Sequence, residues 1–254
     1  MAKKKNTKPV YTVEERIQRV WEVERIKDLM SRRSFYIANN DRRAELNDFW
    51  VAEPEHRATA SFGSNWGYYV GMDSISNYYV VRHHERMMEA LREYCSTHPE
   101  VEYSEDNLGF GCMISRPLNT PLVVLSGDGQ TAKGIWYSIG QESIARSGKT
   151  ADCRWFNGKI AADFVKENGE WKIWHLVDSN DFSVAPGGSV NDIPTRLAPE
   201  DNAAAVEFGK GDIEMLTHNG MLNWSDDYPF LPQEYFRFSR EISYGPEGHP
   251  DYED

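Results

Sequence analysis

The chain has 254 residues, of which 40% are hydrophobic and 13% aromatic, and it carries a formal net charge of −12 at pH 7. This length and apolar content suffice for one domain with a complete core and a substantial extension. The negative charge argues against nucleic-acid binding, which requires a basic surface, and no run of about 18 apolar residues could span a membrane.

The first residues, MAKKKNTK, cluster lysines without the apolar stretch that a secretory signal requires. We therefore expect residues 1–12 to form a disordered basic tail and the protein to be cytoplasmic. The three cysteines, Cys95, Cys112 and Cys153, are an odd number without metal-ligand spacing, as expected for free thiols in a reducing compartment. The sequence contains no P-loop, dinucleotide fingerprint or zinc signature, so we expect no cofactor and no metal.

Helices are predicted first along the chain. Thr12 and Glu15 have the spacing of a capping box, and the apolar residues that follow recur at helical spacing, which predicts a first helix from about Val13 to near Ala38. Polar residues 39–41 end this first helix. The last of them, Asp41, can cap a second predicted helix, Arg42 to Trp50, which ends before a proline.

The third predicted helix carries a polar break in an apolar stripe. A segment rich in glycine and aromatic residues, 58–71, predicts a strand, a turn and a second short strand, and the helix then runs from Asp73 to just before His98. Arg82 and His83 interrupt its stripe and should point where the core would otherwise lie. Because burying both groups without partners is costly, they either have partners in the core or line a polar cavity.

After this helix the chain becomes rich in β-branched residues. Four long strands are predicted, in two hairpins: Thr120 to Ser126 with Thr131 to Ser143, and Ala151 to Lys166 with Trp171 to Phe182. Glycine-containing turns join the members of each hairpin, and Asn168-Gly169 supplies the positive φ angles of a tight turn. Helices followed by an antiparallel sheet predict an α+β domain over residues 13–183.

From residue 184 to 254 the pattern weakens into proline, glycine and acidic clusters, with one short helix predicted at about 199–208. Aromatic residues recur in this extension at Trp224, Tyr228, Phe230, Tyr235, Phe236 and Phe238. Exposed together, they would form an adhesive surface. We therefore expect the extension to wrap the core or a neighbouring subunit.

Three segments, in this order along the chain, carry a family resemblance: residues 36–41, 71–75 and 163–173. Together with the order of elements, they resemble the SnoaL-like branch of the nuclear transport factor 2-like superfamily over residues 13–183. The resemblance implies a cone-shaped α+β barrel, with three N-terminal helices packed on one curved antiparallel sheet around a deep apolar pocket. It also implies a homo-oligomer, a trimer or a dimer.

Members of this family include ketosteroid isomerases, scytalone dehydratase, bile-acid dehydratases and polyketide cyclases, none of which needs a metal or an organic cofactor. In its length and aromatic content the chain also resembles the γ-formaldehyde lyase that converts lignin-derived diarylpropanes to stilbenes. The resemblance thus implies an enzyme that acts on a small organic molecule without a cofactor. Fold-level likeness does not determine the reaction.

Site residues follow from the resemblance position by position. Tyr36 matches the family tyrosine whose hydroxyl donates to a substrate oxygen, and Asp41 matches the acid paired with it in bile-acid dehydratases. Tyr79 falls where the isomerases place a pocket tyrosine, and His83 lies one turn beyond it on the same helix face.

Two positions depart from the family pattern. Ser61-Phe62 stands where ketosteroid isomerases carry their catalytic aspartate, and the segment from Trp136 to Gly140 lacks the strand aspartate of the dehydratases. These departures put both of those mechanisms in doubt. A catalytic site in this chain must therefore use other groups.

An elimination without a cofactor needs one group to take a proton, one to give a proton and a wall that excludes water. Tyr36, Asp41, His83 and Asp163 are the candidates for proton transfer, with His83 titrating nearest neutral pH and Arg82 stabilising a phenolate or enolate. Aromatic side chains are expected to line the pocket, and Asp163 to reach it. The aromatic set is Trp50, Phe62, Trp66, Tyr68, Tyr79, Trp136, Trp155 and Trp174.

Each assignment has a structural alternative. Asp41 can act only as a helix cap, and Asp163, on a strand beside a turn, can be a solvated or ion-paired surface acid. His175 is best interpreted as a satisfied structural histidine. The tryptophans are core residues by default, and only their number indicates an aromatic pocket.

Three function classes remain. We favour a cofactor-independent lyase acting on a small aromatic molecule, which releases formaldehyde from a hydroxymethyl-bearing carbon or eliminates water. An isomerase or cyclase of steroid or polyketide-like molecules is the alternative, and the missing acid counts against it. The third class is a non-catalytic binding or assembly subunit, which the polar stripe of the third helix disfavours.

Overall fold

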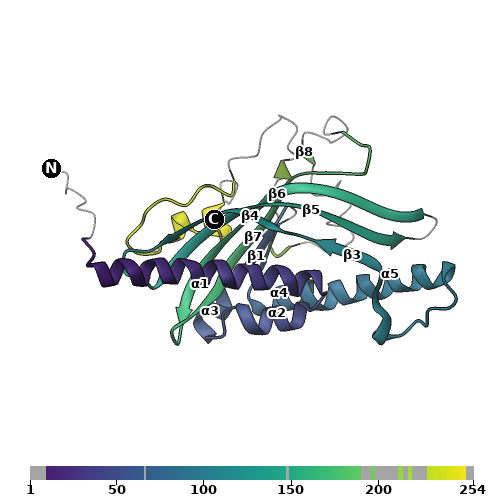
Figure 1. Cartoon of the computed structure of the whole chain (residues 1–254), viewed down its shortest axis with the longest axis horizontal. Helices are drawn as coiled ribbons and strands as arrows, with labels where there is room; N and C mark the ends of the chain where they lie inside the picture. Colours follow the sequence, from purple (N-terminus) through teal and green to yellow (C-terminus); the bar gives the residue numbers. More distant parts are fainter. Residues whose placement is uncertain are drawn as a thin grey trace.

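The computed structural model describes residues 10–65, 67–146, 149–189, 196–197, 211–213, 217–218 and 228–249. Residues 1–9, Trp66, the predicted helix at 199–208 and Trp224 lie outside the described residues. In Figure 1 the helices lie on one side of a long curved sheet, and the C-terminal segment 228–249, in yellow, lies on the other side. We call these two sides of the sheet the helix-facing side and the outer side.

The three helices predicted for the domain are confirmed. Helix α1 spans Val13–Ala38, and its capping box is formed: the Thr12 hydroxyl accepts from the Glu15 amide at 3.2 Å, while the Glu15 carboxylate accepts from the Thr12 amide at 2.7 Å. Helix α2 spans Arg42–Phe49. The third helical stretch consists of α4 (Met72–Ser76), a π-helical segment (Asn77–Arg82) and α5 (His83–Thr97).

Within the domain, one α-helix and one strand were not predicted from the sequence pattern. Helix α3 spans Pro54–Thr59, and its proline, which we interpreted as a helix end, occupies the first turn, where the missing N–H costs nothing. Strand β3 spans Leu108–Ser115, and its glycines weaken the strand signal. Gly111 has a φ of +76°, and a Cβ there would lie 2.8 Å from the Tyr94 Cβ, so the glycine permits close packing of β3 on α5.

The sheet contains both strand directions. Its other strands are β1 (Ser61–Ser64), β2 (Gly67–Val70), β4 (Leu118–Leu125), β5 (Thr131–Arg146), β6 (Lys149–Glu167) and β7 (Glu170–Val184). Their order is β2-β1-β7-β6-β5-β3, with β4 also paired to β5. All pairs are antiparallel except β1 with β7, so the sheet is mixed and open, whereas we expected an antiparallel barrel. The two strands of the parallel pair are far apart along the chain, with helices and strands β2 to β6 between them, so no tight hairpin joins them.

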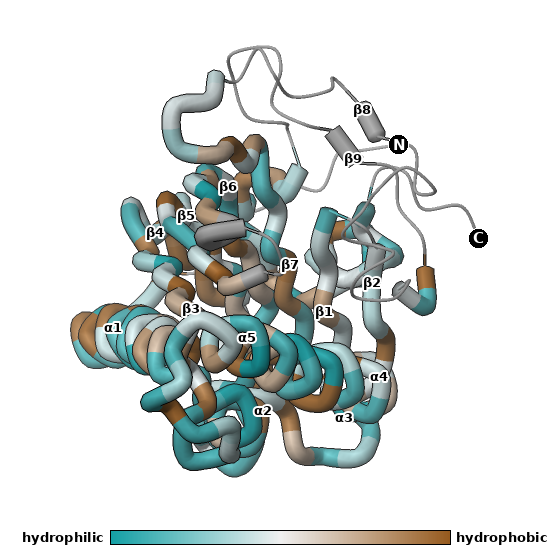
Figure 2. The backbone as a smooth tube through the Cα atoms, turned by 90° about the vertical axis from the view of Figure 1, so that its right-hand side faces the viewer, coloured by the Kyte–Doolittle hydropathy of each residue, from teal (hydrophilic) through white to brown (hydrophobic). Residues whose placement is uncertain are grey.

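Alternation along the strands separates two cores. On the helix-facing side, Phe62, Ile160 and Leu176 belong to the main core with α1 and α2. On the outer side, Ala161 and Val177 pack with aromatic residues of the C-terminal segment, among them Tyr228, Phe230 and Tyr244. Figure 2 shows the strands arching over the helices. The α+β cone fold is therefore confirmed, and the strand register decides which side chains can meet beneath the sheet.

Two further pairs of residues form short strands, β8 (Arg196–Leu197) and β9 (Thr217–His218), which pair with each other. Single-turn helices follow at Arg240–Ile242 and Pro246–Gly248, and another precedes β3 at Glu105–Asn107. Within the described part of the extension, the backbone of Tyr235 accepts from Gly127, and the Tyr244 hydroxyl donates to the Phe230 carbonyl at 2.7 Å. Segment 228–249 thus packs on its own chain, while the domain boundary at 183 and the oligomeric state stay predictions.

Candidate functional site

Five polar side chains meet in the interior between α1, α2 and the π-helical segment; we call them the interior polar cluster. The Arg33 guanidinium donates from Nε to Glu45 Oε1 at 2.7 Å and from Nη2 to the Tyr79 hydroxyl at 2.6 Å. Arg42 donates from Nη1 to the same hydroxyl at 2.7 Å, and the Trp50 indole donates to Glu45 Oε1 at 3.1 Å. Two cations therefore converge on one buried phenol.

Two members of this cluster, Arg33 and Glu45, occupy positions that the amphipathic pattern assigns to the core. Arg33 lies on the face of α1 that buries Ile26, Met30 and Ile37, and its side chain is only 2% exposed. Glu45 lies on the buried face of α2 and is 0% exposed. A buried ion pair of this kind contributes little net stability, because the desolvation of both charges offsets their attraction. Its presence in the core is therefore not explained by the net stability of the pair.

Two atoms of the interior polar cluster are left without partners. Glu45 Oε2 and Arg42 Nε are both buried, and no described residue offers either of them a hydrogen bond. A buried polar atom without a partner costs about 1–3 kcal/mol, more when the group is charged. Such atoms indicate a place where a further polar group binds.

Aromatic rings adjoin the interior polar cluster on one side. The Phe62 ring lies 5.3 Å from the Tyr79 ring and 5.4 Å from the Tyr78 ring, and Tyr69 stacks on Tyr78 at 4.1 Å. Phe62, Tyr69 and Tyr79 are buried members of the main core, and Tyr78 packs against it. Flat rings arranged in this way suit an aromatic ligand, although they also serve as ordinary core packing.

The Tyr79 hydroxyl is protonated at neutral pH. Burial raises the pKa of this group, and the cations of Arg33 and Arg42 only partly oppose that effect, while Glu45 and Asp178 raise it further. Because the oxygen accepts two N–H groups, its own O–H remains available as a donor. Tyr79 is therefore equipped to donate a hydrogen bond to a substrate oxygen whose developing charge the two guanidinium groups would stabilise.

His83 lies near this site as a neutral imidazole. Its Nε2 is hydrogen-bonded to the Asn40 side-chain oxygen. Burial, and then the nearby cations of Arg42 and Arg86, lower the pKa of His83 to about 2. The expectation that His83 titrates near neutral pH is therefore wrong, because the group is desolvated and surrounded by positive charge. A neutral imidazole can still orient a substrate, but it gives no proton at pH 7.

Arg82, the second polar residue of the stripe, points away from the interior. Its side chain is 53% exposed and pairs with Glu85 at 3.4 Å. A π-helical turn contains more residues than an α-helical one, so positions 75, 79 and 83 stay on the inner face, while position 82 turns outward. The expected shared cavity of Arg82, His83 and Tyr36 is not formed.

Tyr36 and Asp41 also lie apart from the interior polar cluster. The Tyr36 hydroxyl donates to Asp48 Oδ2 at 2.8 Å, and this contact raises the pKa of the tyrosine. Asp41 is exposed and caps α2, accepting from the Ala44 amide at 3.2 Å. Arg33 and Ile37 occupy the buried face of α1, whereas Tyr36 is half-buried against the main core, with its ring 5.0 Å from the Phe49 ring.

Three further predicted site residues lie on the outer side or at the edge of the sheet. Tyr68 is buried beneath the C-terminal segment and donates to the Tyr244 carbonyl at 3.1 Å. Asp163 is fully buried there rather than solvated, and Trp174 donates to the Thr59 hydroxyl at 2.9 Å beside α3. Irregularities in the pairing of β6 with β7 contribute to this arrangement, which residue spacing alone did not reveal.

The partners of Asp163 form a second buried cluster, which anchors the C-terminal segment. Asp163 pairs with Lys133 at 2.5 Å and with His175 at 2.9 Å, and its Oδ2 accepts from the Tyr244 amide at 2.7 Å and the Ser243 hydroxyl at 3.0 Å. Burial raises the pKa of this carboxyl, but Lys133 and His175 lower it more, so it is held below its usual value. His175 is thus a structural histidine, as interpreted from the sequence.

The other predicted aromatic residues divide between core and surface. Trp50, Phe62 and Trp136 are buried on the helix-facing side, as members of the main core. Trp155 is 48% exposed, and Trp66 lies outside the described residues. Among the predicted residues, Tyr79, Trp50 and Phe62 therefore gather at or beside the interior polar cluster, with His83 nearby.

Residue spacing missed Arg33, Arg42 and Glu45. A signal for Arg33 existed: it continues the apolar series of Ile26, Met30 and Ile37 on α1, as Arg82 seemed to do on the third helix. Glu45 precedes the buried residues of α2 in the same way. Their pairing could not be foreseen, because it depends on how α2 turns back against α1.

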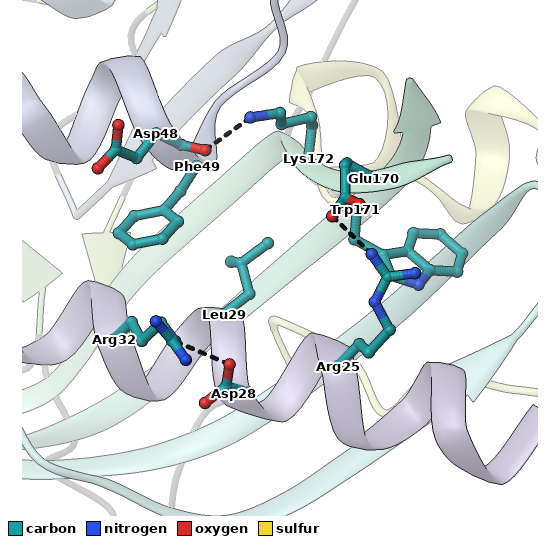
Figure 3. A pocket seen from close by; sticks show the side chains of 9 residues that line it. All are labelled: Arg25, Asp28, Leu29, Arg32, Asp48, Phe49, Glu170, Trp171 and Lys172. Carbon is teal, nitrogen blue, oxygen red and sulfur yellow. Dashed lines mark hydrogen bonds and ion pairs between the residues drawn. The ribbon is translucent and has the colours of Figure 1, made fainter. Parts of the chain in front are cut away.

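An open groove, of about 220 Å³, lies between α1, α2 and the β6–β7 hairpin (Figure 3). Its lining contains three cationic and three acidic residues around an apolar floor that includes Leu29 and Phe49. Arg25 pairs with Glu170 at 2.5 Å and Arg32 with Asp28 at 2.8 Å. Lys172 donates to the Asp48 backbone carbonyl at 2.6 Å, and the Asp48 carboxylate accepts from the Tyr36 hydroxyl at 2.8 Å. With its charges balanced and satisfied, this groove is a weaker candidate site than the interior polar cluster.

Within the described ranges, no group of three or more His, Cys, Asp or Glu side chains is placed to hold a metal ion. No helix in the same part of the chain is long and apolar enough to cross a membrane. The three cysteines are free.

Comparison with solved structures finds similar folds at low identity. An NTF2-like protein with a cystatin-like fold from Novosphingobium aromaticivorans is 13% identical, covering 68% of this chain and 92% of its own, with a TM-score of 0.40. A hexachlorocyclohexane dehydrochlorinase (LinA) of type 2 is 10% identical, covering 66% and 91%, with a TM-score of 0.44. The β subunit of benzoate 1,2-dioxygenase from Burkholderia mallei is 12% identical, covering 68% and 92%, with a TM-score of 0.40. These likenesses say nothing about activity.

A comparison with curated proteins finds no match. The model of the SnoaL-like domain family, by contrast, matches residues 18–177, which is more than half of the chain and includes every member of the interior polar cluster. The relation to the γ-formaldehyde lyase stays a prediction. The family resemblance itself is confirmed, and the protein belongs to the SnoaL-like domain family.

Proposed function

We propose that this protein is a cofactor-independent lyase that acts on a small aromatic molecule at the interior polar cluster. The substrate class that we favour is a diarylpropane diol of the kind derived from lignin, with one benzylic hydroxyl and one terminal CH₂OH group. The reaction releases formaldehyde, or water alone, by acid/base elimination. Isomerisation or cyclisation of a steroid or polyketide-like molecule is the alternative.

One observation carries this proposal. Arg33 and Arg42 both donate to the hydroxyl of Tyr79, at 2.6 and 2.7 Å, inside an apolar core. Electrostatic stabilisation by donors held in advance is often the largest contribution to enzyme catalysis, and it is strongest where water is excluded. The net stability that buried charged groups add to a core is small, which favours a chemical role for two cations on one phenol.

The reaction needs no redox partner, because its atoms and electrons balance without one. A diarylpropane diol that loses one formaldehyde and one water gives a stilbene of the same overall oxidation level. The terminal hydroxyl gives up its proton, the C–C bond to the CH₂O carbon breaks, and its electron pair forms the new C=C bond. The benzylic oxygen leaves as water after it receives a proton. A positioned acid and a positioned base are sufficient for these steps.

The interior residues supply most of these functions. Tyr79 donates its O–H to the departing oxygen, and Arg33 and Arg42 stabilise the charge on the tyrosine that results; this replaces the anion-stabilising role that we expected of Arg82. The rings of Phe62 and Tyr78 offer a flat wall to an aromatic substrate.

The proposal is tested with the full-length protein and a diarylpropane diol whose rings carry hydroxyl and methoxy groups. Formation of the stilbene is followed by its absorbance, and formaldehyde is measured chemically in the same samples. We expect both products in equal amounts, before and after exhaustive treatment with a chelator. Water loss without formaldehyde would identify a dehydratase. No conversion of the diol, together with isomerisation of an unsaturated ketosteroid, would replace the lyase by the isomerase.

A further inference from the structure

Only one of the two carboxylate oxygens of Glu45 has hydrogen-bond partners among the described residues. Its Oε1 accepts from Arg33 Nε at 2.7 Å and from Trp50 Nε1 at 3.1 Å. Its Oε2 is equally buried, yet none of the described residues donates to it. A fully buried carboxylate oxygen has a strong requirement for a donor, so this atom indicates where a ligand donates a hydrogen bond.

Glu22 provides the matched comparison within the same fold. It also lies on the buried face of its helix and also accepts from a tryptophan, Trp171 Nε1, at 2.6 Å on Oε2. Its Oε1 accepts from Lys166 Nζ at 2.7 Å and from Gln18 Nε2 at 2.8 Å. Both oxygens of Glu22 are thus satisfied. The unpartnered oxygen of Glu45 is therefore a property of its site and does not follow from burying a glutamate beside an indole.

The groups around Glu45 define the chemical class of the ligand. A hydroxyl can donate to Oε2 while it accepts from Tyr79 O–H or from the unpartnered Arg42 Nε–H. An ether or a ketone oxygen cannot donate, so it would leave Oε2 unsatisfied. A carboxylate or phosphate would repel Glu45. The cluster therefore selects a neutral alcohol or a phenol.

We propose that Glu45 Oε2 binds the reacting hydroxyl of the substrate and takes its proton. This inference rests on the proposed lyase function and assigns its base. The terminal O–H bond breaks, the proton moves to Oε2, and the electron pair left on oxygen forms the C=O bond of formaldehyde as the C–C bond breaks. The benzylic oxygen leaves as water with the Tyr79 proton. Return of the proton from Glu45 to the Tyr79 oxygen restores both groups.

Binding of two probes tests the assignment without depending on turnover. The probes are a diarylpropane alcohol that keeps the terminal CH₂OH but lacks the benzylic hydroxyl, so that it cannot be converted, and its analogue in which CH₃ replaces CH₂OH. Dissociation constants are measured by calorimetry for the wild-type protein, Glu45→Gln and the matched control Glu22→Gln. We expect the wild type to bind the alcohol about tenfold or more tighter than the analogue, because a hydrogen bond to a buried charge is lost with the hydroxyl.

Glu45→Gln replaces Oε2 or its neighbour by an NH₂ group, so we expect the preference to fall to about threefold or less. Glu22→Gln should keep it. An equal affinity of the wild type for both probes, or a preference that survives in Glu45→Gln, would overturn the assignment. If Glu45→Gln does not fold, the structure of the wild type with the alcohol that lacks the benzylic hydroxyl decides: the terminal oxygen must lie within about 3.2 Å of Oε2.

The same measurements separate this inference from the proposed function. If the preference depends on Glu45 but the protein does not convert the diol, Glu45 binds the hydroxyl and the proposed lyase function is wrong. If the protein converts the diol but the preference is unchanged in Glu45→Gln, the lyase function holds and Glu45 is not its base. Failure of the wild type to bind either probe overturns both.

Discussion

The Arg33 guanidinium and the Glu45 carboxylate form an ion pair of 2.7 Å between α1 and α2, at 2% and 0% side-chain exposure. The pair joins the two helices under the sheet and places two charged groups beside the Tyr79 hydroxyl. Removal of one partner leaves the other charge uncompensated in the core, which is far more costly than the net value of the pair. This asymmetry governs how the site responds to substitution.

Arg33→Met should lower the free energy of unfolding by about 3–5 kcal/mol, because the buried Glu45 carboxyl then loses its cation and one of its two hydrogen-bond donors. The neighbouring Arg32→Met is the control, since Arg32 forms an exposed pair with Asp28 at 2.8 Å and should change stability by less than about 1 kcal/mol. Urea denaturation of both variants measures the difference. Equal effects at the two positions would contradict the interpretation of the buried pair.

Tyr79→Phe should lower kcat/KM for the diol by about tenfold or more, because the transition state loses a donor supported by two cations. Tyr36→Phe removes the hydroxyl that contacts Asp48 instead, so it should leave the rate within about twofold. Steady-state kinetics on both variants, with circular dichroism to verify folding, compare the two tyrosines. A larger loss in Tyr36→Phe would restore the role that the family resemblance implies for Tyr36.

His83 should make the protein less stable at acidic pH. Its pKa is about 2 in the folded state, against an ordinary value of 6.5, so below pH 6.5 the unfolded chain binds a proton that the folded chain does not. The stability lost through this group grows from pH 6.5 downward and reaches about 3 kcal/mol at pH 4.5.

His83→Gln removes this dependence. The difference in unfolding free energy between the wild type and His83→Gln should therefore shift in favour of the variant by about that amount between pH 7 and pH 4.5. Urea titrations at the two pH values measure it. A difference that does not change with pH would show that His83 titrates normally in the folded protein.

Asp163→Asn should destabilise the protein by about 3–5 kcal/mol and loosen the C-terminal segment, because the buried Lys133 amine then loses its anionic partner. Trypsin cleavage at Arg237 and Arg240 should become faster. The double variant Asp163→Asn with Lys133→Met should recover part of the lost stability, since the unpaired charge is gone. Unchanged cleavage and stability in Asp163→Asn would mean that the buried pair does not anchor this segment.

Two substitutions at Asp41 separate a helix-capping role from a catalytic role. Asp41→Ala should cost about 1 kcal/mol of stability, whereas Asp41→Asn should cost only a few tenths, because asparagine caps a helix about as well. Both variants should retain the rate of the wild type on the diol. A tenfold lower rate in Asp41→Asn at unchanged stability would instead assign Asp41 the acid role that the resemblance implies.

The local elements could be predicted from the sequence because their determinants lie within a few residues of one another. Thr12 and Glu15 determine where α1 begins, and the turn at Asn168-Gly169 joins β6 to β7. Helix α3 and strand β3 were missed because their local residues give an ambiguous signal. The proline of α3 is compatible with either an end or a start, and the glycines of β3 weaken its strand pattern.

The candidate site depended on relationships that no local pattern contains. The sequence by itself determined that polar groups interrupt the apolar stripes of the helices and that aromatic residues are abundant. Only the tertiary structure decided that Arg33 meets Glu45 while Arg82 turns to solvent, and that Asp163 lies on the outer side of the sheet. The physical reason is that a π-helical turn, a strand register and the angle between two helices each rotate a side chain from one side to the other, and packing of the whole chain sets all three.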